Sequence, residues 1–358
     1  MLDEIIDEEY CDVIVLGRML LADPDVPKKV MQKKYDEICR CIRCMNCLEF
    51  FIHDHPISCL QNPVVGRERI YDKLTPAVKS KKVAIIGGGP AGLEAGLVSA
   101  RRGHDVTIYE KEKRPGGQFN LASLSKGKGI FRPYAIGWRR KQCEKANVKF
   151  KFSERIDVKA AKSLFNENDV LIIATGATWE TPVLLGETSK GVSNNVDILL
   201  GKEKINGNKV VVGINGPSWS ASSRDAAEFA EIIAKKGIDV TIVGALPFPG
   251  PALGEINFFN SQLLLGSLNE LGVKNIPNAR IASLVKEGVE VICDDGRREI
   301  LETDHIVLTW GVKPSTEIAD AVAEDIPEGK EVYVIGDCAR PRNAYYAIFD
   351  GLRVGHKI

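Results

Sequence analysis

Residues 82–110 contain the feature that most limits how this chain can fold. An apolar stretch, 82–86, runs into Gly87-Gly88-Gly89-Pro90-Ala91-Gly92, and a helical pattern over 91–102 leads to a second apolar stretch, 105–109. Strand, glycine turn, helix and strand at this spacing predict a βαβ unit. The chain is therefore expected to be an α/β protein.

The glycine turn is also a dinucleotide-binding pattern. Gly87 allows the tight turn, Gly89 lets the backbone approach a pyrophosphate, and Gly92 lets the helix press against the strand. The helix N-terminus then presents its partial positive charge to the phosphates. Glu110 follows about twenty residues later, where a carboxylate accepts from ribose hydroxyls. Its charge disfavours a phosphorylated ribose, so NAD, FAD and ADP fit better than NADP; a glycine turn without a ligand is the alternative.

Three further turns favour FAD at this site. Gly116-Gly117-Gln118 lies beyond the ribose-binding strand, and Ala174-Thr175-Gly176 ends another apolar strand. Gly336-Asp337 follows a third strand, and a helix starting near Tyr345 would direct its N-terminus at the flavin ring. Each turn is common, but their order along the chain is specific. The expected cofactor-binding residues are Gly87, Gly89, Pro90, Ala91, Gly92, Glu110, Gly117, Gln118, Ala174, Thr175, Gly176, Gly336 and Asp337.

Four cysteines precede this motif with the compact spacing Cys41-x2-Cys44-x2-Cys47-x11-Cys59. Three thiolates within seven residues suit one face of a 4Fe-4S cluster, and a fourth from a later turn completes the ligand set. Zinc is the alternative, but structural zinc sites usually take two separated C-x2-C pairs. The spacing therefore favours an iron–sulfur cluster.

The clustering of the cysteines in a chain without an export signal also favours a metal site. Nine cysteines are an odd number, and five of them fall between residues 39 and 59. The first nine residues lack the basic start of an export signal, so we expect a cytoplasmic protein whose clustered cysteines bind metal. Cys39 breaks the ligand register and is not expected to be a ligand. His53 and His55 are expected to be polar loop residues, with an imidazole ligand as the alternative.

Length and charge limit the classes of partner. A chain of 358 residues is expected to form two or three domains. Its 48 basic and 48 acidic residues cancel without a block of like charge, which makes nucleic acid and acidic membranes poor partner candidates. No apolar run approaches the length of a membrane-spanning helix, so no membrane span is expected.

A second βαβ unit is expected from strands at 209–212 and 239–243 with a helix over about 225–236. Its glycine motif is degraded, because Gly213-Ile-Asn-Gly216 is followed by several extra residues before the helix. Gly244 also stands where a ribose-binding acid would end the second strand. The Rossmann-like fold is expected here, and nicotinamide binding is left open.

Together these motifs resemble the trimethylamine dehydrogenase, 2,4-dienoyl-CoA reductase and 2-enoate reductase group, which is related to old yellow enzyme. Members begin with an FMN-binding (β/α)8 barrel. Here the apolar residues 12–16 are expected to form a strand, and 15–18 followed by 22–24 resembles the barrel's last strand and FMN-phosphate loop. The resemblance implies that the four cysteines hold 4Fe-4S and that the first βαβ unit holds FAD, or ADP in its place. No barrel precedes Met1 in this sequence. We therefore expect that a separate FMN-binding subunit supplies the barrel, or that the chain is a fragment or a repurposed module.

We therefore expect two Rossmann-like nucleotide-binding domains of the glutathione-reductase-like kind after a small cysteine-rich iron–sulfur segment. The expected division is 1–35 as a partner-contact segment, 36–75 as the 4Fe-4S segment, 80–200 plus 306–358 as the FAD domain, and 201–305 as the second domain.

The function expected from these features is that of an oxidoreductase subunit. It would move electrons between NAD(P)H, FAD and a 4Fe-4S cluster, and on to an FMN-containing partner that reduces an enoate or enoyl substrate or oxidises an amine. No catalytic side chain is expected, because flavin accepts hydride directly. The alternatives are a structural or assembly subunit with a passive ADP or FAD site, and a free-standing NADH:acceptor reductase.

Overall fold

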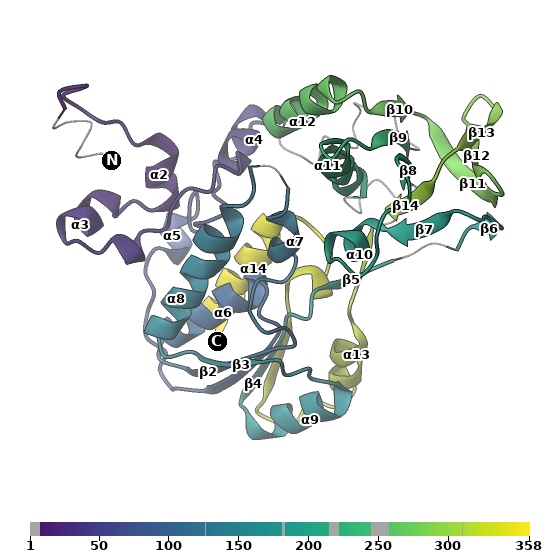
Figure 1. The fold of residues 1–358 in the computed structure, drawn as a ribbon. Helices are drawn as coiled ribbons and strands as arrows, with labels where there is room; N and C mark the ends of the chain where they lie inside the picture. The colour runs from purple at the N-terminus through teal and green to yellow at the C-terminus, as the bar shows by residue number, and fades with distance from the viewer. Residues whose placement is uncertain (1–7, 126, 181–182, 215–221, 245–257, 310) are drawn as a thin grey trace.

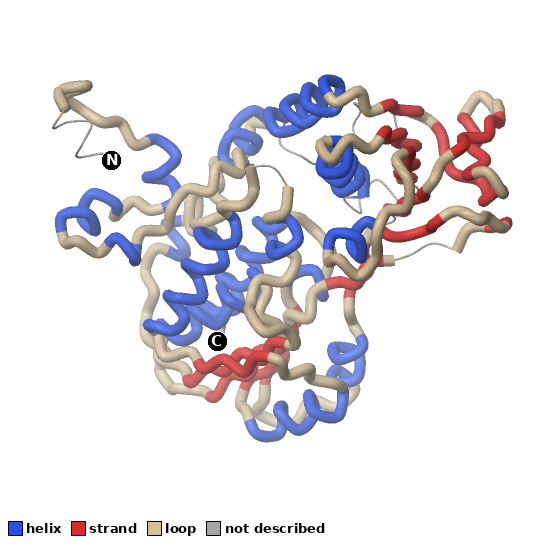
Figure 2. The backbone as a smooth tube through the Cα atoms, viewed as in Figure 1, coloured by secondary structure: helices blue, strands red, loops and turns tan. Residues whose placement is uncertain are grey.

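The first sheet has five parallel strands in the order β16-β4-β1-β2-β3. Figure 1 labels β2, β3 and β4 of this sheet, and Figure 2 draws its strands in red. The computed structural model describes residues 8–125, 127–180, 183–214, 222–244, 258–309 and 311–358. The strands are β1 (Lys82–Ile86), β2 (Asp105–Glu110), β3 (Lys149–Phe152), β4 (Val170–Ile173) and β16 (Glu331–Val334). The expected βαβ unit is confirmed, with α6 (Pro90–Arg101) between β1 and β2.

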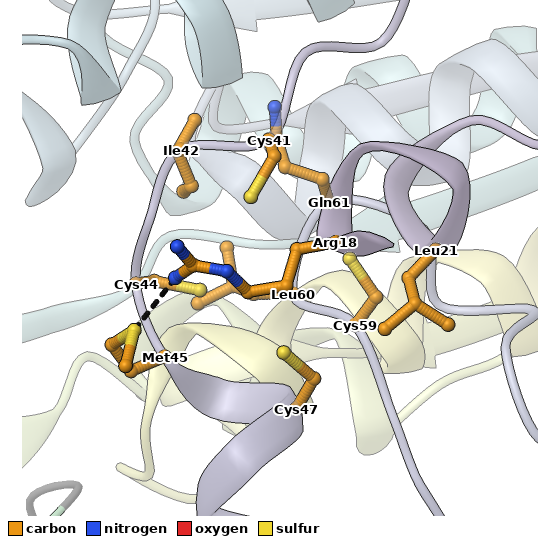
Figure 3. A pocket seen from close by; sticks show the side chains of 10 residues that line it. All are labelled: Arg18, Leu21, Cys41, Ile42, Cys44, Met45, Cys47, Cys59, Leu60 and Gln61. Carbon is orange, nitrogen blue, oxygen red and sulfur yellow. Dashed lines mark hydrogen bonds between the residues drawn. The ribbon is translucent and has the colours of Figure 1, made fainter. Parts of the chain in front are cut away.

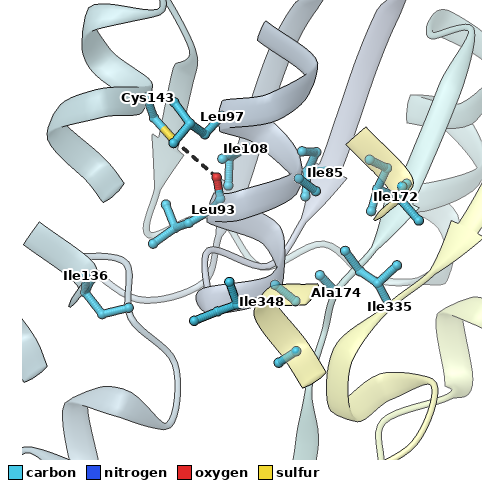
Figure 4. Close-up of a cluster of buried hydrophobic side chains, with 14 of the residues drawn as sticks. Ile85, Leu93, Leu97, Ile108, Ile136, Cys143, Ile172, Ala174, Ile335 and Ile348 are labelled. Atoms are coloured by element: carbon cyan, nitrogen blue, oxygen red, sulfur yellow. Dashed lines mark hydrogen bonds between the residues drawn. The ribbon is translucent and has the colours of Figure 1, made fainter. Parts of the chain in front are cut away.

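Alternation along β1 sends its side chains into two separate cores. Val83 and Ile85 face one core, which α6, α8 (Trp138–Lys145) and α14 (Ala344–Lys357) help to build. Figure 4 shows Ile85 and Ile172 of the sheet beside Leu93 of α6 and Ile348 of α14. Ala84 and Ile86 face the other core, under α9 (Val158–Glu167) and α13 (Glu317–Ala323). The sheet is therefore covered on both faces.

The second sheet is also parallel, in the order β10-β9-β8-β14-β7. Its strands are β7 (Gly191–Asn194), β8 (Lys209–Ile214), β9 (Asp239–Gly244), β10 (Lys274–Ile276) and β14 (His305–Thr309). The second expected βαβ unit is confirmed, with α11 (Ser222–Ala234) between β8 and β9. β7 and residues 306–309 of β14 belong to this sheet, although the expected boundaries at 200/201 and 305/306 assigned them to the FAD domain.

A small sheet of order β13-β12-β11-β6 lies beside the second sheet (Figure 1). Its members are β6 (Leu185–Gly186), β11 (Ala279–Val285), β12 (Gly288–Cys293) and β13 (Arg298–Glu302). β12 and β13 form an antiparallel hairpin, and Gly296 supplies the positive φ of 84° in its turn. β5 (Ala177–Trp179) pairs with β15 (Val312–Pro314) where the chain passes between the two large sheets.

Polar contacts made by α11 and α12 join the second sheet's helices to the rest of the described chain. The Glu228 carboxylate of α11 accepts from Ser125 Oγ at 2.7 Å and pairs with Lys128 and Arg224. Burial raises the pKa of Glu228, but the two cations outweigh it and lower that pKa to about 2. The Asn260 amide of α12 (Phe258–Glu270) donates to the Cys44 carbonyl at 3.3 Å. α12 therefore contacts the cysteine segment directly (Figure 1).

The first part of the described chain is built from short helices. They are α2 (Gly17–Ala22), α3 (Val26–Met31), η1 (Tyr35–Glu37), α4 (Asn46–Ile52) and α5 (Glu68–Tyr71). The strand expected over 12–16 is wrong, since no strand is assigned there and no described strand pairs with it. Val13 and Val15 are instead 74% and 88% exposed. A strand needs a neighbour for its backbone groups, and these residues have none here. No helix in the described residues is long and apolar enough to span a membrane.

Candidate cofactor sites

The glycine turn between β1 and α6 requires glycine at its first and last positions. Gly87 has a φ of 111°, and a Cβ there would lie 2.2 Å from the Ala174 carbonyl oxygen. A Cβ on Gly92 would lie 2.0 Å from the Gly87 carbonyl oxygen. Both contacts are impossible for a side chain, so these glycines let helix, turn and β4 pack together.

Gly89 differs, because a Cβ there would meet nothing within 4 Å. It is the N-cap of α6, and no side chain caps this helix, whose first residue is Pro90. The first-turn N–H groups of a helix need partners, and an anion in front of the helix is one that serves. The open space at Gly89 and the uncapped helix therefore fit the pyrophosphate of a dinucleotide.

Glu110 is buried at the end of β2 and lies beside the turn. Its Oε2 accepts from the Gly88 N–H at 2.8 Å, and its Oε1 accepts from the Glu112 N–H at 2.8 Å. These two bonds hold the carboxylate in one orientation. Each oxygen keeps a further lone pair with which to accept from a ribose hydroxyl.

The 116–118 and 336–337 turns meet in front of the 87–92 turn. A Cβ on Gly117 would lie 3.3 Å from Gly89 Cα, and the Gln118 amide donates to Asp337 Oδ2 at 3.0 Å. Burial raises the pKa of Asp337, and Arg342, whose N–H donates to Oδ1 at 3.2 Å, offsets this in part. The expected residues at the ends of β1, β2, β4 and β16 thus come together, while their contacts with a cofactor stay a prediction.

The four expected cluster ligands line one small pocket, shown in Figure 3. The loop that carries Cys41, Cys44 and Cys47 bends sharply, because Arg43 and Met45 both adopt a left-handed backbone conformation, with φ of 55° and 63°. Burial raises the pKa of the Cys44 thiol to about 12. The residues that line the pocket are Arg18, Leu21, Cys41, Ile42, Cys44, Met45, Cys47, Cys59, Leu60 and Gln61.

The choice between a cluster and a zinc ion stays a prediction, and the lining of this pocket is compatible with a cluster. A tetrahedral zinc site with Zn–S bonds near 2.3 Å needs sulfurs about 3.8 Å apart. Among the described residues, no three His, Cys, Asp or Glu side chains are grouped closely enough to hold one metal ion. A cubane spreads its four thiolates over four irons, and the apolar Leu21, Ile42 and Leu60 surround the site. The four cysteines therefore fit 4Fe-4S.

The other metal-ligand candidates lie outside this pocket. Cys39 is buried, its N–H donates to Asp23 Oδ2 at 2.8 Å, and burial raises its thiol pKa to about 12. His53 is exposed and bonds to Glu49 at 2.9 Å, and the His55 ring contacts Phe50. Neither histidine lines the pocket. This placement agrees with the expectation that none of the three is a ligand, which stays a prediction.

Residues 81–351 match the family model described as pyridine nucleotide-disulphide oxidoreductase. The chain belongs to this family. It is 30% identical over 360 residues to the NADH oxidase of Thermoanaerobacter brockii, a match that covers 99% of this chain and 53% of that protein. A solved 2-naphthoyl-CoA reductase has 32% identity and a TM-score of 0.88, covering 100% of this chain and 52% of that one. Histamine dehydrogenase from Rhizobium sp. 4-9 has 24% identity and a TM-score of 0.87, and the match covers 100% of this chain and 56% of that one.

These matches confirm the resemblance inferred from the motifs. The chain corresponds to the flavin and NAD(P)H part of the 2-enoate reductase and trimethylamine dehydrogenase family, and it is a flavoprotein oxidoreductase of the glutathione-reductase-like α/β fold. It spans about half the length of the curated relatives it matches. The degraded second glycine motif falls mainly at 215–221, outside the described residues.

Sequence analysis missed the residue that ties the cysteine pocket to the dinucleotide turn. Arg139 of α8 is fully buried, and its Nε donates to Glu94 Oε2 of α6 at 2.8 Å. Its Nη1 and Nη2 donate to Gln61 Oε1 and to the Gln61 carbonyl oxygen at 2.8 and 2.7 Å. One guanidinium therefore connects the pocket-lining Gln61 to α6, the helix that follows the glycine turn. Nothing in the charged stretch 138–145 marks this residue as buried.

Proposed function

We propose that this chain is the electron-transfer part of a larger flavoenzyme, holding FAD in its first Rossmann-like unit and a 4Fe-4S cluster in the cysteine pocket. The observation that carries the proposal is the placement of Cys41, Cys44, Cys47 and Cys59 around one pocket, joined by Arg139 to the helix at the dinucleotide turn. FAD would supply two-electron exchange with NAD(P)H and one-electron exchange with the cluster.

The side chains of this chain would bind and orient the cofactors. Gly89 and the N-terminus of α6 would receive the pyrophosphate, and Glu110 would accept from the ribose. Asp337, held by Gln118, would accept from the ribityl hydroxyls, and the 174–176 turn would lie along the cofactor. No side-chain acid or base is assigned to hydride transfer, because flavin takes the hydride directly.

The N-terminal segment would contact an FMN-binding barrel, on a partner or on the same polypeptide. In support, the described residues 8–35 expose several large apolar side chains: Tyr10, Val13, Val15, Leu20, Met31 and Tyr35. Because relatives include a reductase of 2-naphthoyl-CoA and a histamine dehydrogenase, we propose that the barrel reduces an enoate- or enoyl-type substrate or oxidises an amine.

The test is cofactor analysis after anaerobic purification. We expect FAD together with about four irons and four sulfides per chain. Serine at any one of Cys41, Cys44, Cys47 or Cys59 should lower the iron content, whereas the matched control Cys39→Ser should keep it. Tetrahedral zinc in the native protein would contradict the cluster, and bound ADP in place of FAD would favour the passive structural subunit.

A further inference from the structure

The first turn of α14 carries a buried tyrosine whose hydroxyl is unpaired. Tyr345 is 1% exposed, and its hydroxyl has no hydrogen-bond partner within the described structure. Leaving a buried hydroxyl unpaired costs about 1–3 kcal/mol, and phenylalanine has almost the same shape without that cost. Burial raises the pKa of Tyr345, so the phenol is a neutral hydrogen-bond donor. An unpaired buried donor calls for an explanation other than fold stability.

The Tyr345 side chain faces the cysteine segment. Its ring lies 5.3 Å from the ring of Phe50, at an angle of 62°, and Phe50 belongs to α4, the helix that holds Cys47. Arg67 and Ser58, the residue before Cys59, both lie close enough to the hydroxyl to lower its pKa against the effect of burial. The phenol therefore faces two of the stretches that carry the cysteines.

The Tyr345 backbone belongs to the other site. Its N–H donates to the Asn343 side chain at 3.1 Å, which caps α14 immediately after the Asp337 turn. α14 packs tightly on α6, since a Cβ on Gly351 would lie 2.5 Å from the Ala91 carbonyl oxygen. Tyr345 is thus a single residue with its backbone at the dinucleotide site and its side chain in the cysteine segment.

We propose that Tyr345 is a positioning residue between the two cofactor sites and that its hydroxyl is the donor reserved for the bound iron–sulfur group. This inference rests on the proposed function. Binding of the cluster converts four thiols into an anionic group of sulfur acceptors, which gives the phenol O–H a charge to stabilise. Hydrogen bonds toward cluster sulfurs stabilise the reduced, more negative state and raise the reduction potential.

The experiment compares Tyr345→Phe with the matched control Tyr346→Phe in the holoprotein. Tyr346 is the next residue, but it is 37% exposed and its ring lies against Arg342. Anaerobic redox titration followed by electron paramagnetic resonance should give a more negative cluster potential for Tyr345→Phe and an unchanged one for Tyr346→Phe. In the cofactor-free protein, urea unfolding should show Tyr345→Phe to be at least as stable as wild type, because no hydrogen bond is lost.

Two outcomes separate this inference from the function on which it rests. Wild-type protein without iron would overturn both. A full complement of FAD and iron in Tyr345→Phe, with the cluster potential of wild type, would overturn the role of the hydroxyl alone. Tyr345→Leu also removes the ring, and it should slow electron transfer from flavin to cluster without changing the rate of flavin reduction by NADH. An unchanged rate of electron transfer from flavin to cluster would overturn the positioning role.

Discussion

Replacing Arg139 with methionine should destabilise the protein strongly. The guanidinium is fully buried and donates to Glu94, to both oxygens of Gln61 and to the Ala135 carbonyl oxygen. Methionine keeps much of the volume but leaves the Glu94 carboxylate buried without its cation. Removal of one partner of such a pair costs about 3–5 kcal/mol, a large part of a typical total of about 5–15 kcal/mol.

The assay is urea unfolding followed by tryptophan fluorescence, with Trp138 as a local reporter beside the site. Arg140→Met is the matched control, because Arg140 is 44% exposed, pairs with Glu144 one turn away and lies over the Phe152 ring at the surface. Its ion pair is exposed and should be worth less than about 1 kcal/mol. Changing Glu94 to leucine in the Arg139→Met background should recover part of the loss, since no unpaired charge remains. Equal destabilisation by the Arg139 and Arg140 substitutions would refute the reasoning.

Other predictions concern the dinucleotide turn and the contact between the two large sheets. Gly89→Val should keep the urea midpoint of the cofactor-free protein but abolish flavin binding, because the added side chain fills open space; flavin retention measured by absorption would place the site elsewhere. Gly92→Ala should lower that midpoint itself, since its Cβ would meet Gly87 O, and an unchanged midpoint would count against the close packing. Burial, aided by Glu228, raises the pKa of Asp225 to about 7. The folded state therefore keeps a proton on Asp225 that the unfolded chain releases above pH 3.8. The free energy of unfolding of the wild type should therefore fall as the pH rises from 3.8 to about 7. Asp225→Asn should lack this loss and be the more stable protein at pH 8; equal slopes across that pH range would contradict it.

Local patterns were enough to predict the nucleotide-binding core. Strands β1 and β2 read as apolar stretches, and the glycines between them are required by contacts within the same βαβ unit. The Asp337 turn was predictable for the same reason, because it directly follows an apolar strand. These features depend on neighbours in the sequence, so their signal is local.

Contacts between distant segments were not predictable. Arg139 looks like a surface residue among other charges, and its partner Gln61 lies 78 positions away. The placement of β7 and β14 in the second sheet depends on which strands pair, which no local pattern states. The 12–16 stretch has the composition of a strand but no partner strand in the described residues. Tyr345 was recognised only as the start of a helix, since burial of its side chain arises from the cysteine segment about 290 residues earlier.

The central claim is that electrons pass from a nicotinamide to FAD and on to a 4Fe-4S cluster held by this chain. The most direct measurement is anaerobic titration of the purified holoprotein with NADH, and in parallel with NADPH, followed by visible absorption and electron paramagnetic resonance. The account predicts loss of the oxidised-flavin bands and the appearance of a reduced-cluster signal within the first equivalents. Two results would contradict it. In one, the flavin stays oxidised although NADH or NADPH is in excess; in the other, the flavin is reduced but no reduced-cluster signal develops.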